Sequence, residues 1–233
     1  MGAETQDMIY TASTWILPVL LAITLHEAAH GFVAWRLGDD TAYRAGRVTF
    51  NPLRHVDTMG TVVLPAMLLL LRAPFLFGWA KPVPVNFGRL GRPRRDMVLV
   101  AAAGPAANIL IATLSALLFH VLVMVPETAA LWLAHNFYNA ILINLVLAIF
   151  NMLPLPPLDG GRVAVGLLPR ALALPLARLE RYGFLILIGI VFVLPMLSRQ
   201  VGLDLNLFDW LVWQPIEAVL PVFLWLAGLP SGG

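Results

Sequence analysis

Residues 8–37 read MIYTASTWILPVLLAITLHEAAHGFVAWRL, and this stretch decides the fold of the chain. Its first 18 residues carry no charge, which is close to the length of apolar helix that crosses a bilayer. The motif HEAAH, residues 26–30, follows at once. Positions i and i+4 share a face of a helix, so both imidazoles point the same way and can meet one tetrahedral zinc ion. Glu27 projects elsewhere and could act as a general base.

The composition is that of an integral membrane protein. Of the 233 residues, 60% are hydrophobic and only 12% are charged, and the mean hydropathy is +0.83. Soluble domains are about 45–50% apolar and about 25% charged. The chain has no cysteine, which excludes disulfides, thiolate metal sites and a catalytic thiol. Any metal must therefore be held by His, Asp or Glu.

The motif HEAAH has a functional and a plainer interpretation. Imidazole and carboxylate groups beside an apolar span cost free energy unless they have partners, which favours a functional site. The plainer alternative is two helix-end histidines at the membrane interface with a snorkelling glutamate. The metal hypothesis requires a third ligand elsewhere in the chain.

Hydropathy predicts an all-α polytopic fold with about five transmembrane helices. Asp96 is expected to cap the second span. Between the first two spans we expect a short strand at 47–50 and a re-entrant or short helical segment at 59–79. Residues 162–181 carry arginines and prolines typical of a broken interfacial helix. The predicted spans cover residues 8–37, 97–125, 129–153, 182–197 and 207–229.

The distribution of positive charge predicts the topology. If residues 59–79 cross the bilayer, the 15 Lys and Arg divide ten against five between its two sides. If they return to the same side, fourteen lie together and only Arg199 lies opposite. The second division agrees better with the excess of positive charge in cytoplasmic loops. It places the N-terminus outside, and it places His30 and Asp159 toward the cytoplasm.

Asp159 is the best candidate for the third ligand, because it follows a proline break at the inner end of the third predicted span. Its alternative role is to cap the helix that begins near Gly161. The rival ligands are His55, which lies in a predicted loop, and His120 and His135, which lie toward the outer ends of their spans.

The chain resembles the site-2 protease family of intramembrane zinc metalloproteases, in its small bacterial and archaeal form without PDZ or CBS domains. The resemblance covers about residues 15–165. It implies a three-helix catalytic core, one zinc ion on His26, His30 and Asp159, and Glu27 as the base. The matching motifs are HEAAH at 26–30, GPAAN at 104–108 and NMLPLPPLDG at 151–160, with the similar stretches GRVTFNPL at 46–53 and GWAKPVPVN at 78–86.

The remaining assignments follow from that resemblance. Residues 1–233 form a single membrane protease domain with the core at about 8–165 and C-terminal helices at about 166–229. Asn151 is expected near the substrate carbonyl, where it could stabilise an oxyanion, or it could bond between helices. Asn108 is a candidate substrate contact, with helix packing beside Gly104 as the alternative.

The expected substrate is a transmembrane-helix protein in the cell membrane, cut near the cytoplasmic side. Such a helix must unwind before cleavage, and an extended segment at 46–50 or 82–86 could receive it by strand addition. Both segments could instead be plain connectors. Other functions that fit less well are a metal-binding or ion-transport protein and a protease-like protein that binds substrates without cutting them.

Overall fold

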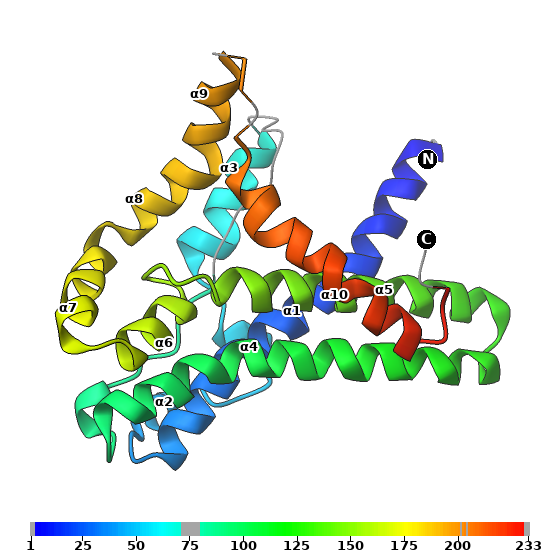
Figure 1. Cartoon of the computed structure of the whole chain (residues 1–233). Helices are drawn as coiled ribbons and strands as arrows, with labels where there is room; N and C mark the ends of the chain where they lie inside the picture. Colours follow the sequence, from blue (N-terminus) through cyan, green and yellow to red (C-terminus); the bar gives the residue numbers. More distant parts are fainter. Residues whose placement is uncertain (1–2, 71–79, 201, 204, 231–233) are drawn as a thin grey trace.

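The computed structural model describes residues 3–70, 80–200, 202–203 and 205–230 (Figure 1). Within these residues the fold is entirely helical and contains no strand. Four helical stretches are long and apolar enough to cross a membrane: Thr5–Arg36, Pro93–Met124, Glu127–Asn151 and Arg170–Gln200. The chain is therefore a polytopic helical membrane protein, as its hydropathy predicts.

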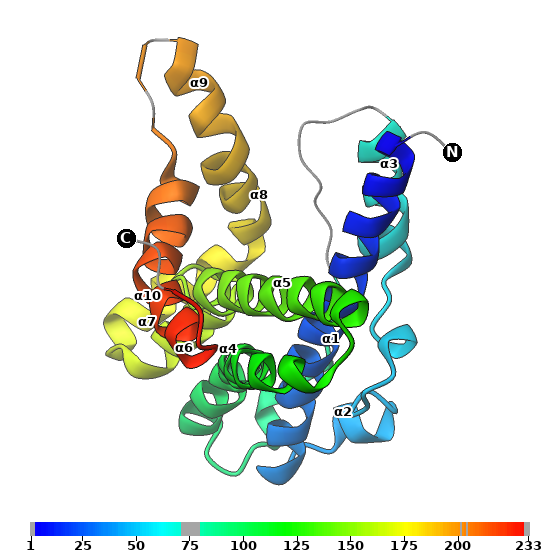
Figure 2. The ribbon, with the colours of Figure 1, turned by 90° about the vertical axis from the view of Figure 1, so that its right-hand side faces the viewer.

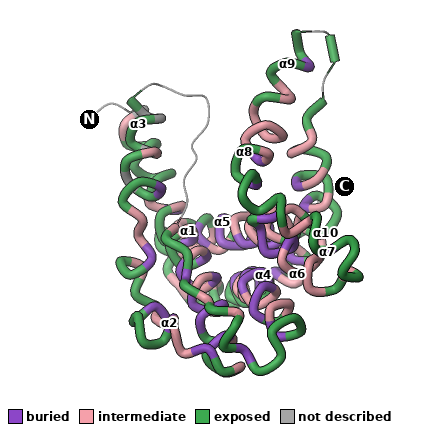
Figure 3. Tube along the Cα trace, turned by 90° about the vertical axis from the view of Figure 1, so that its left-hand side faces the viewer, coloured by how far each residue is buried: buried purple, intermediate pink, exposed green. Residues whose placement is uncertain are grey.

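Three helices form the centre of the molecule. Helix α4 (Pro93–Leu118) lies side by side with α5 (Glu127–Asn151), and α1 (Ala3–Arg36) crosses both (Figures 1 and 2). Buried residues concentrate at this crossing (Figure 3). The apolar core joins α4 and α5 to α10 (Gln214–Leu226), and it is built from Ala112, Ala116, Ile141, Leu145, Val212 and Ile216. These three helices include the predicted motifs HEAAH and GPAAN, and their role as a catalytic core stays a prediction.

The second long helix begins earlier than predicted. Pro93 occupies its first turn, where the missing N–H is not needed and the fixed φ suits a helix. Asp96 therefore lies inside the helix, and its Oδ2 accepts a hydrogen bond of 2.7 Å from the N–H of Arg92. The prediction that Asp96 is the N-cap was wrong, although its carboxylate still satisfies a backbone donor at this helix end.

The C-terminal third is a series of shorter helices. Figure 2 shows α8 and α9 extending to the same side of the α4–α5 pair as the N-terminal part of α1, whereas α10 lies against that pair. The predicted fifth span, 207–229, forms helix up to Leu226 but is not among the four stretches that qualify as spans. The helices before α10 are α6 (Asp159–Leu167), α7 (Arg170–Arg178), α8 (Gly183–Ile188) and α9 (Leu194–Gln200).

The connection between the first two long helices differs from the prediction at one point. Residues 48–50 form bends and Arg47 has no regular structure, so the predicted strand at 47–50 was wrong. A strand needs a partner strand, and Arg47 instead turns inward to donate hydrogen bonds to backbone carbonyls. Helix α2 (Thr41–Arg44) precedes this segment, and a helical stretch ending in α3 (Leu64–Leu70) follows it. Residues 71–79 of the predicted re-entrant segment lie outside the described residues.

Candidate metal centre

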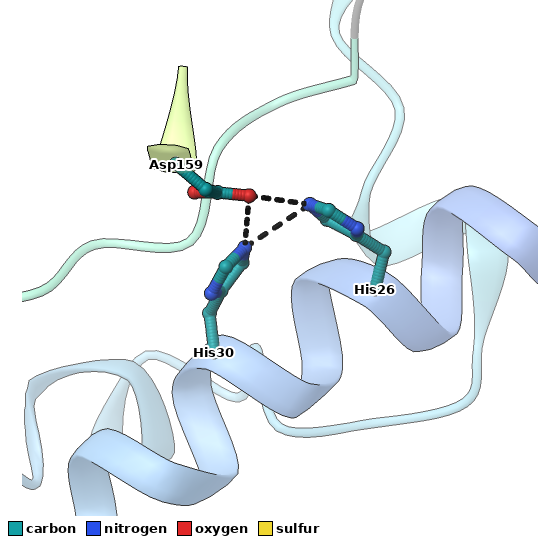
Figure 4. A group of neighbouring side chains, drawn as sticks. All are labelled: His26, His30 and Asp159. Carbon is teal, nitrogen blue, oxygen red and sulfur yellow. Dashed lines mark hydrogen bonds and ion pairs between the residues drawn. The ribbon is translucent and has the colours of Figure 1, made fainter. Parts of the chain in front are cut away.

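The structure brings the three predicted metal ligands together. Helix α1 carries His26 and His30 one turn apart, and Asp159 lies at the first position of α6 (Figure 4). The two Nε2 atoms are 3.1 Å apart, and each is 3.2 Å from Oδ2 of Asp159. Ligands about 2.0–2.1 Å from a tetrahedral zinc ion are separated by about 3.3 Å. The observed triangle therefore has the size of one face of such a tetrahedron.

The positions of the protons explain why these atoms need a cation. Nδ1 of His30 donates to the carbonyl oxygen of Val100 over 2.7 Å, and Nδ1 of His26 donates to Oδ1 of Asn108 over 2.6 Å. In a neutral imidazole the second nitrogen then bears a lone pair. Both Nε2 lone pairs face Oδ2 of Asp159, a buried atom without a hydrogen-bond partner. Three buried acceptors that converge without a donor fit a bound metal ion.

Asp159 contributes the negative charge of the site. Burial alone would raise the pKa of its carboxyl group, but the imidazoles of His26 and His30 lie against the group and hold its pKa below the usual value. The group is therefore a carboxylate at neutral pH. Its alternative role as a helix cap finds no support, because α6 starts without a side-chain cap.

Helix α4 lies directly against the two imidazoles at Gly104. A Cβ atom at this position would lie 2.4 Å from Nε2 of His30 and 2.6 Å from Nε2 of His26. No side chain larger than hydrogen fits there without moving a ligand. Gly104 thus allows the backbone of α4 to form the rear wall of the site.

Glu27 lies beside the ligands in a pocket of about 260 Å³. Its Oε2 accepts a hydrogen bond of 2.8 Å from the N–H of Val83. Residues 80–86, here called the strap, lie over this side of α1 without regular secondary structure, and Pro82 and Pro84 favour an extended backbone there. Pro82, Val83 and Val85 line the pocket. The carboxylate is therefore fixed close to the metal ligands without joining them.

Two buried charged residues hold the strap at its ends. Arg47 donates to the carbonyl oxygens of Arg54 and Lys81. Asp39 is completely buried, and its Oδ2 accepts a bond of 2.6 Å from the N–H of Asn86. Sequence reasoning missed both residues, because neither belongs to a spacing pattern that points to a site.

Asn151 and Asn108 occupy different places. Asn151 lines the pocket, where its Nδ2 donates to the carbonyl oxygen of Leu147 within the same helix. Asn108 is fully buried behind His26 and does not line the pocket. Asn108 is therefore not placed to contact a substrate in the pocket, because the rotation of α4 turns its side chain away from it. Asn108 bonds instead to His26, a predicted metal ligand.

The rival ligands bond elsewhere. The ring of His55 contacts the carbonyl oxygen of Thr49, His120 contacts that of Leu226, and His135 contacts the hydroxyl of Tyr10. None of the three lies in the pocket or belongs to the His–His–Asp group.

Similarity to known proteins identifies the family of the chain. The family model described as "Peptidase family M50" matches residues 120–196. A relative from Bacillus subtilis (strain 168), named "Putative zinc metalloprotease YwhC", is 38% identical over 198 residues, which cover 82% of this chain and 85% of the relative. The chain belongs to peptidase family M50.

Two further relatives are also named as zinc metalloproteases. "Putative zinc metalloprotease Rip2" of Mycolicibacterium smegmatis is 31% identical over 203 residues, covering 85% of this chain and 75% of the relative. The Mycobacterium tuberculosis (strain H37Rv) protein of the same name is 31% identical over 167 residues, covering 69% and 60%. No solved structure matches the chain. Family membership and the His–His–Asp triangle agree on a zinc metalloprotease.

Proposed function

We propose that this M50 peptidase hydrolyses peptide bonds within or near transmembrane helices, with His26, His30 and Asp159 as its zinc ligands. The observation that carries the proposal is the convergence of three unprotonated ligand atoms in a pocket that also holds Glu27. When bound, zinc supplies Lewis acidity that polarises the scissile carbonyl and activates water near neutral pH. The described chain supplies all other groups that hydrolysis requires.

Glu27 is placed to move the protons. It accepts a proton from the attacking water and returns it to the leaving amine. The bond from the N–H of Val83 keeps the carboxylate oriented toward the pocket. Asn151 uses one amide N–H within its helix, so the other is available to donate to the developing oxyanion.

The strap is suited to receive an unwound substrate. In an extended segment, residues i and i+2 point their N–H and C=O groups in the same direction. Because the N–H of Val83 points at Glu27, the C=O of Val83 and the N–H of Val85 face the same pocket. Neither group has a hydrogen-bond partner among the described residues. A substrate strand could pair with both and lie across the ligands.

We also propose that the chain crosses the membrane five times and that the site lies toward the cytoplasm. The charge distribution supports a segment at 59–79 that returns to the side from which it came. We propose residues 1–233 as a single protease domain. The polar groups of α1 and α5 farther from the site, Tyr10 with His135 and Thr14 with Asn139, are bonded to each other. Such pairing favours helix association over an ion path and argues against the transport alternative.

The decisive experiment measures zinc content and cleavage on the same samples. Wild type, Glu27→Gln and Asp159→Ala are purified in detergent and mixed with single-span helices that carry a mid-helix Gly, Asn or Pro. We expect about one zinc ion and cleavage for wild type. Glu27→Gln should keep zinc and lose cleavage, and Asp159→Ala should lose zinc. Cleavage by Glu27→Gln at the wild-type rate would disprove the base assignment, and a zinc-free wild type would reopen the transport alternative.

Two further measurements test the strap and the topology. Val85→Pro removes the free N–H, whereas Val85→Ala keeps it, so only the proline variant should lose cleavage while retaining zinc. Equal cleavage by both variants would exclude strand pairing at this position. Single cysteines at 88–95 in this cysteine-free chain should label only from the cytoplasmic side. Labelling from outside would overturn the topology.

A further inference from the structure

A chain of buried asparagines connects the metal centre to the backbone of α5. Asn108 of α4 and Asn144 of α5 are both completely inaccessible to solvent. Nδ2 of Asn144 donates to the carbonyl oxygen of Ala140 over 2.8 Å. Nδ2 of Asn108 donates to Oδ1 of Asn144 over 2.7 Å, and Oδ1 of Asn108 accepts the proton of His26 Nδ1. Three consecutive hydrogen bonds thus link a helix carbonyl to a metal ligand.

The donor-to-acceptor direction of these three hydrogen bonds is fixed at the end formed by the carbonyl of Ala140. A backbone carbonyl can only accept, so Asn144 must turn its NH₂ group toward Ala140 and its oxygen toward Asn108. Asn108 must then present its own NH₂ group to Asn144, and this group also lies 3.3 Å from the carbonyl oxygen of Ala22. Only the oxygen of Asn108 remains for His26.

The direction matters because it selects the tautomer of His26. An acceptor opposite Nδ1 places the proton there and leaves the lone pair on Nε2, which faces Asp159. With Asn108 inverted, an NH₂ group would face Nδ1, and the proton would move to Nε2. A protonated Nε2 cannot bind a metal ion. The outer torsion of an asparagine has two nearly equivalent wells, so Asn108 needs neighbours that distinguish its two ends, and Asn144 at 2.7 Å is a closer acceptor for its NH₂ group than the carbonyl of Ala22 at 3.3 Å.

We propose that Asn144 is a positioning residue that orients Asn108 and thereby holds His26 in the tautomer that binds zinc. The inference rests on the proposed ligand set. It concerns His26 alone, because Nδ1 of His30 bonds directly to the carbonyl oxygen of Val100, a group that cannot invert. Partners of this kind, behind a metal ligand, commonly change metal affinity about 10- to 100-fold.

The first test compares zinc affinity in two matched variants of the full chain in detergent, by competition with a chelator. Asn144→Leu removes the orienting residue. Asn139→Leu is the control, because Asn139 is a buried asparagine of the same helix that bonds to Thr14 and contacts no metal ligand. We expect zinc affinity to fall about 10- to 100-fold in Asn144→Leu and to stay within about twofold of wild type in the control. Equal losses in both variants would overturn the inference.

The second test separates orientation from packing. In Asn108→Asp both side-chain oxygens accept, so either rotamer keeps the proton on Nδ1 of His26. Zinc binding should survive in this variant, and adding Asn144→Leu should then change affinity by less than about threefold. The inference fails if Asn144→Leu causes the same loss of zinc affinity in both backgrounds.

Two further variants guard the interpretation. Asn144→Ser cannot reach Asn108, but its hydroxyl can bond to the carbonyl of Ala140 within the helix, so it replaces the leucine variant if that one does not fold. It should show the same loss of affinity. His26→Ala tests the ligand set separately. Zinc retained by His26→Ala would refute the proposed ligands, whereas zinc lost there but bound normally by Asn144→Leu would refute only the role of Asn144.

Discussion

Gly104→Ala is the substitution whose effect follows most directly from the structure. The added Cβ would lie 2.4 Å from Nε2 of His30 and 2.6 Å from Nε2 of His26. Carbon and nitrogen atoms in ordinary contact are about 3.5 Å apart. One imidazole, or helix α4 itself, must therefore move by about 1 Å.

The two consequences of this displacement differ in size. Overpacking costs about 1–3 kcal/mol, and replacing a mid-helix glycine by alanine returns about 1 kcal/mol, so the fold should lose at most about 2 kcal/mol. Zinc binding should suffer more, because ligand distances tolerate only about 0.2 Å. We expect zinc affinity to fall at least about 100-fold, with a proportional loss of cleavage.

The assay combines chelator competition, cleavage of a single-span helix and thermal unfolding in detergent. Gly189→Ala is the matched control, because it lies in a helical stretch and a Cβ there meets no atom within 4 Å. This control should bind zinc like wild type. Unchanged zinc affinity in Gly104→Ala would show that α4 does not lie against the imidazoles, and the described architecture of the site would be wrong.

Three further predictions concern the segments that hold the strap. Arg47→Met removes the hydrogen bonds from a buried guanidinium to two backbone carbonyls and should destabilise the protein by about 2–4 kcal/mol in thermal unfolding while lowering cleavage more than zinc content. Asp39→Ala should lower the stability of the protein by about as much, because it leaves the N–H of Asn86 without its acceptor. For either variant, a stability within about 0.5 kcal/mol of wild type, a margin typical of surface changes, would contradict the expectation. Burial, with the charge of Arg47, lowers the pKa of His55 below its ordinary 6.5 despite the opposing effects of Thr49 and Glu27. As the pH falls through about 6.5, the unfolded chain takes up a proton at His55 before the folded chain does, so stability falls on acidification by at most about 1.4 kcal/mol per pH unit. Unfolding measured from pH 7.5 to 5.5 should therefore show a shallower decline in His55→Gln, and identical slopes would show that His55 does not contribute.

The part of the site that the sequence predicts is the part set by local helix geometry. His26, Glu27 and His30 lie within one turn and a half of a rigid helix, so their relative directions follow from 3.6 residues per turn. Asp159 follows from a different argument, because it lies past a proline break at the inner end of the third predicted span. The strand at 47–50 and the cap at Asp96 failed because both depend on what surrounds the segment. Alternation alone supplies no partner strand, and Pro93 outweighs a capping carboxylate three residues later.

The position of Asn108 behind His26 could also have been predicted from helix geometry, because of the spacing of residues along α4. Val100, Gly104 and Asn108 follow one another at intervals of four, so they form one stripe along the helix, as His26 and His30 do on α1. The two stripes meet antiparallel: Val100 bonds to His30, Gly104 lies against both imidazoles, and Asn108 bonds to His26. If Gly104, which has no side chain, marks the closest approach of α4 to α1, then Asn108, one turn later on α4, must lie behind His26. The sequence does not give the rotation of α5 about its axis. This rotation decides that Asn144, rather than another asparagine of that helix, completes the series of hydrogen bonds.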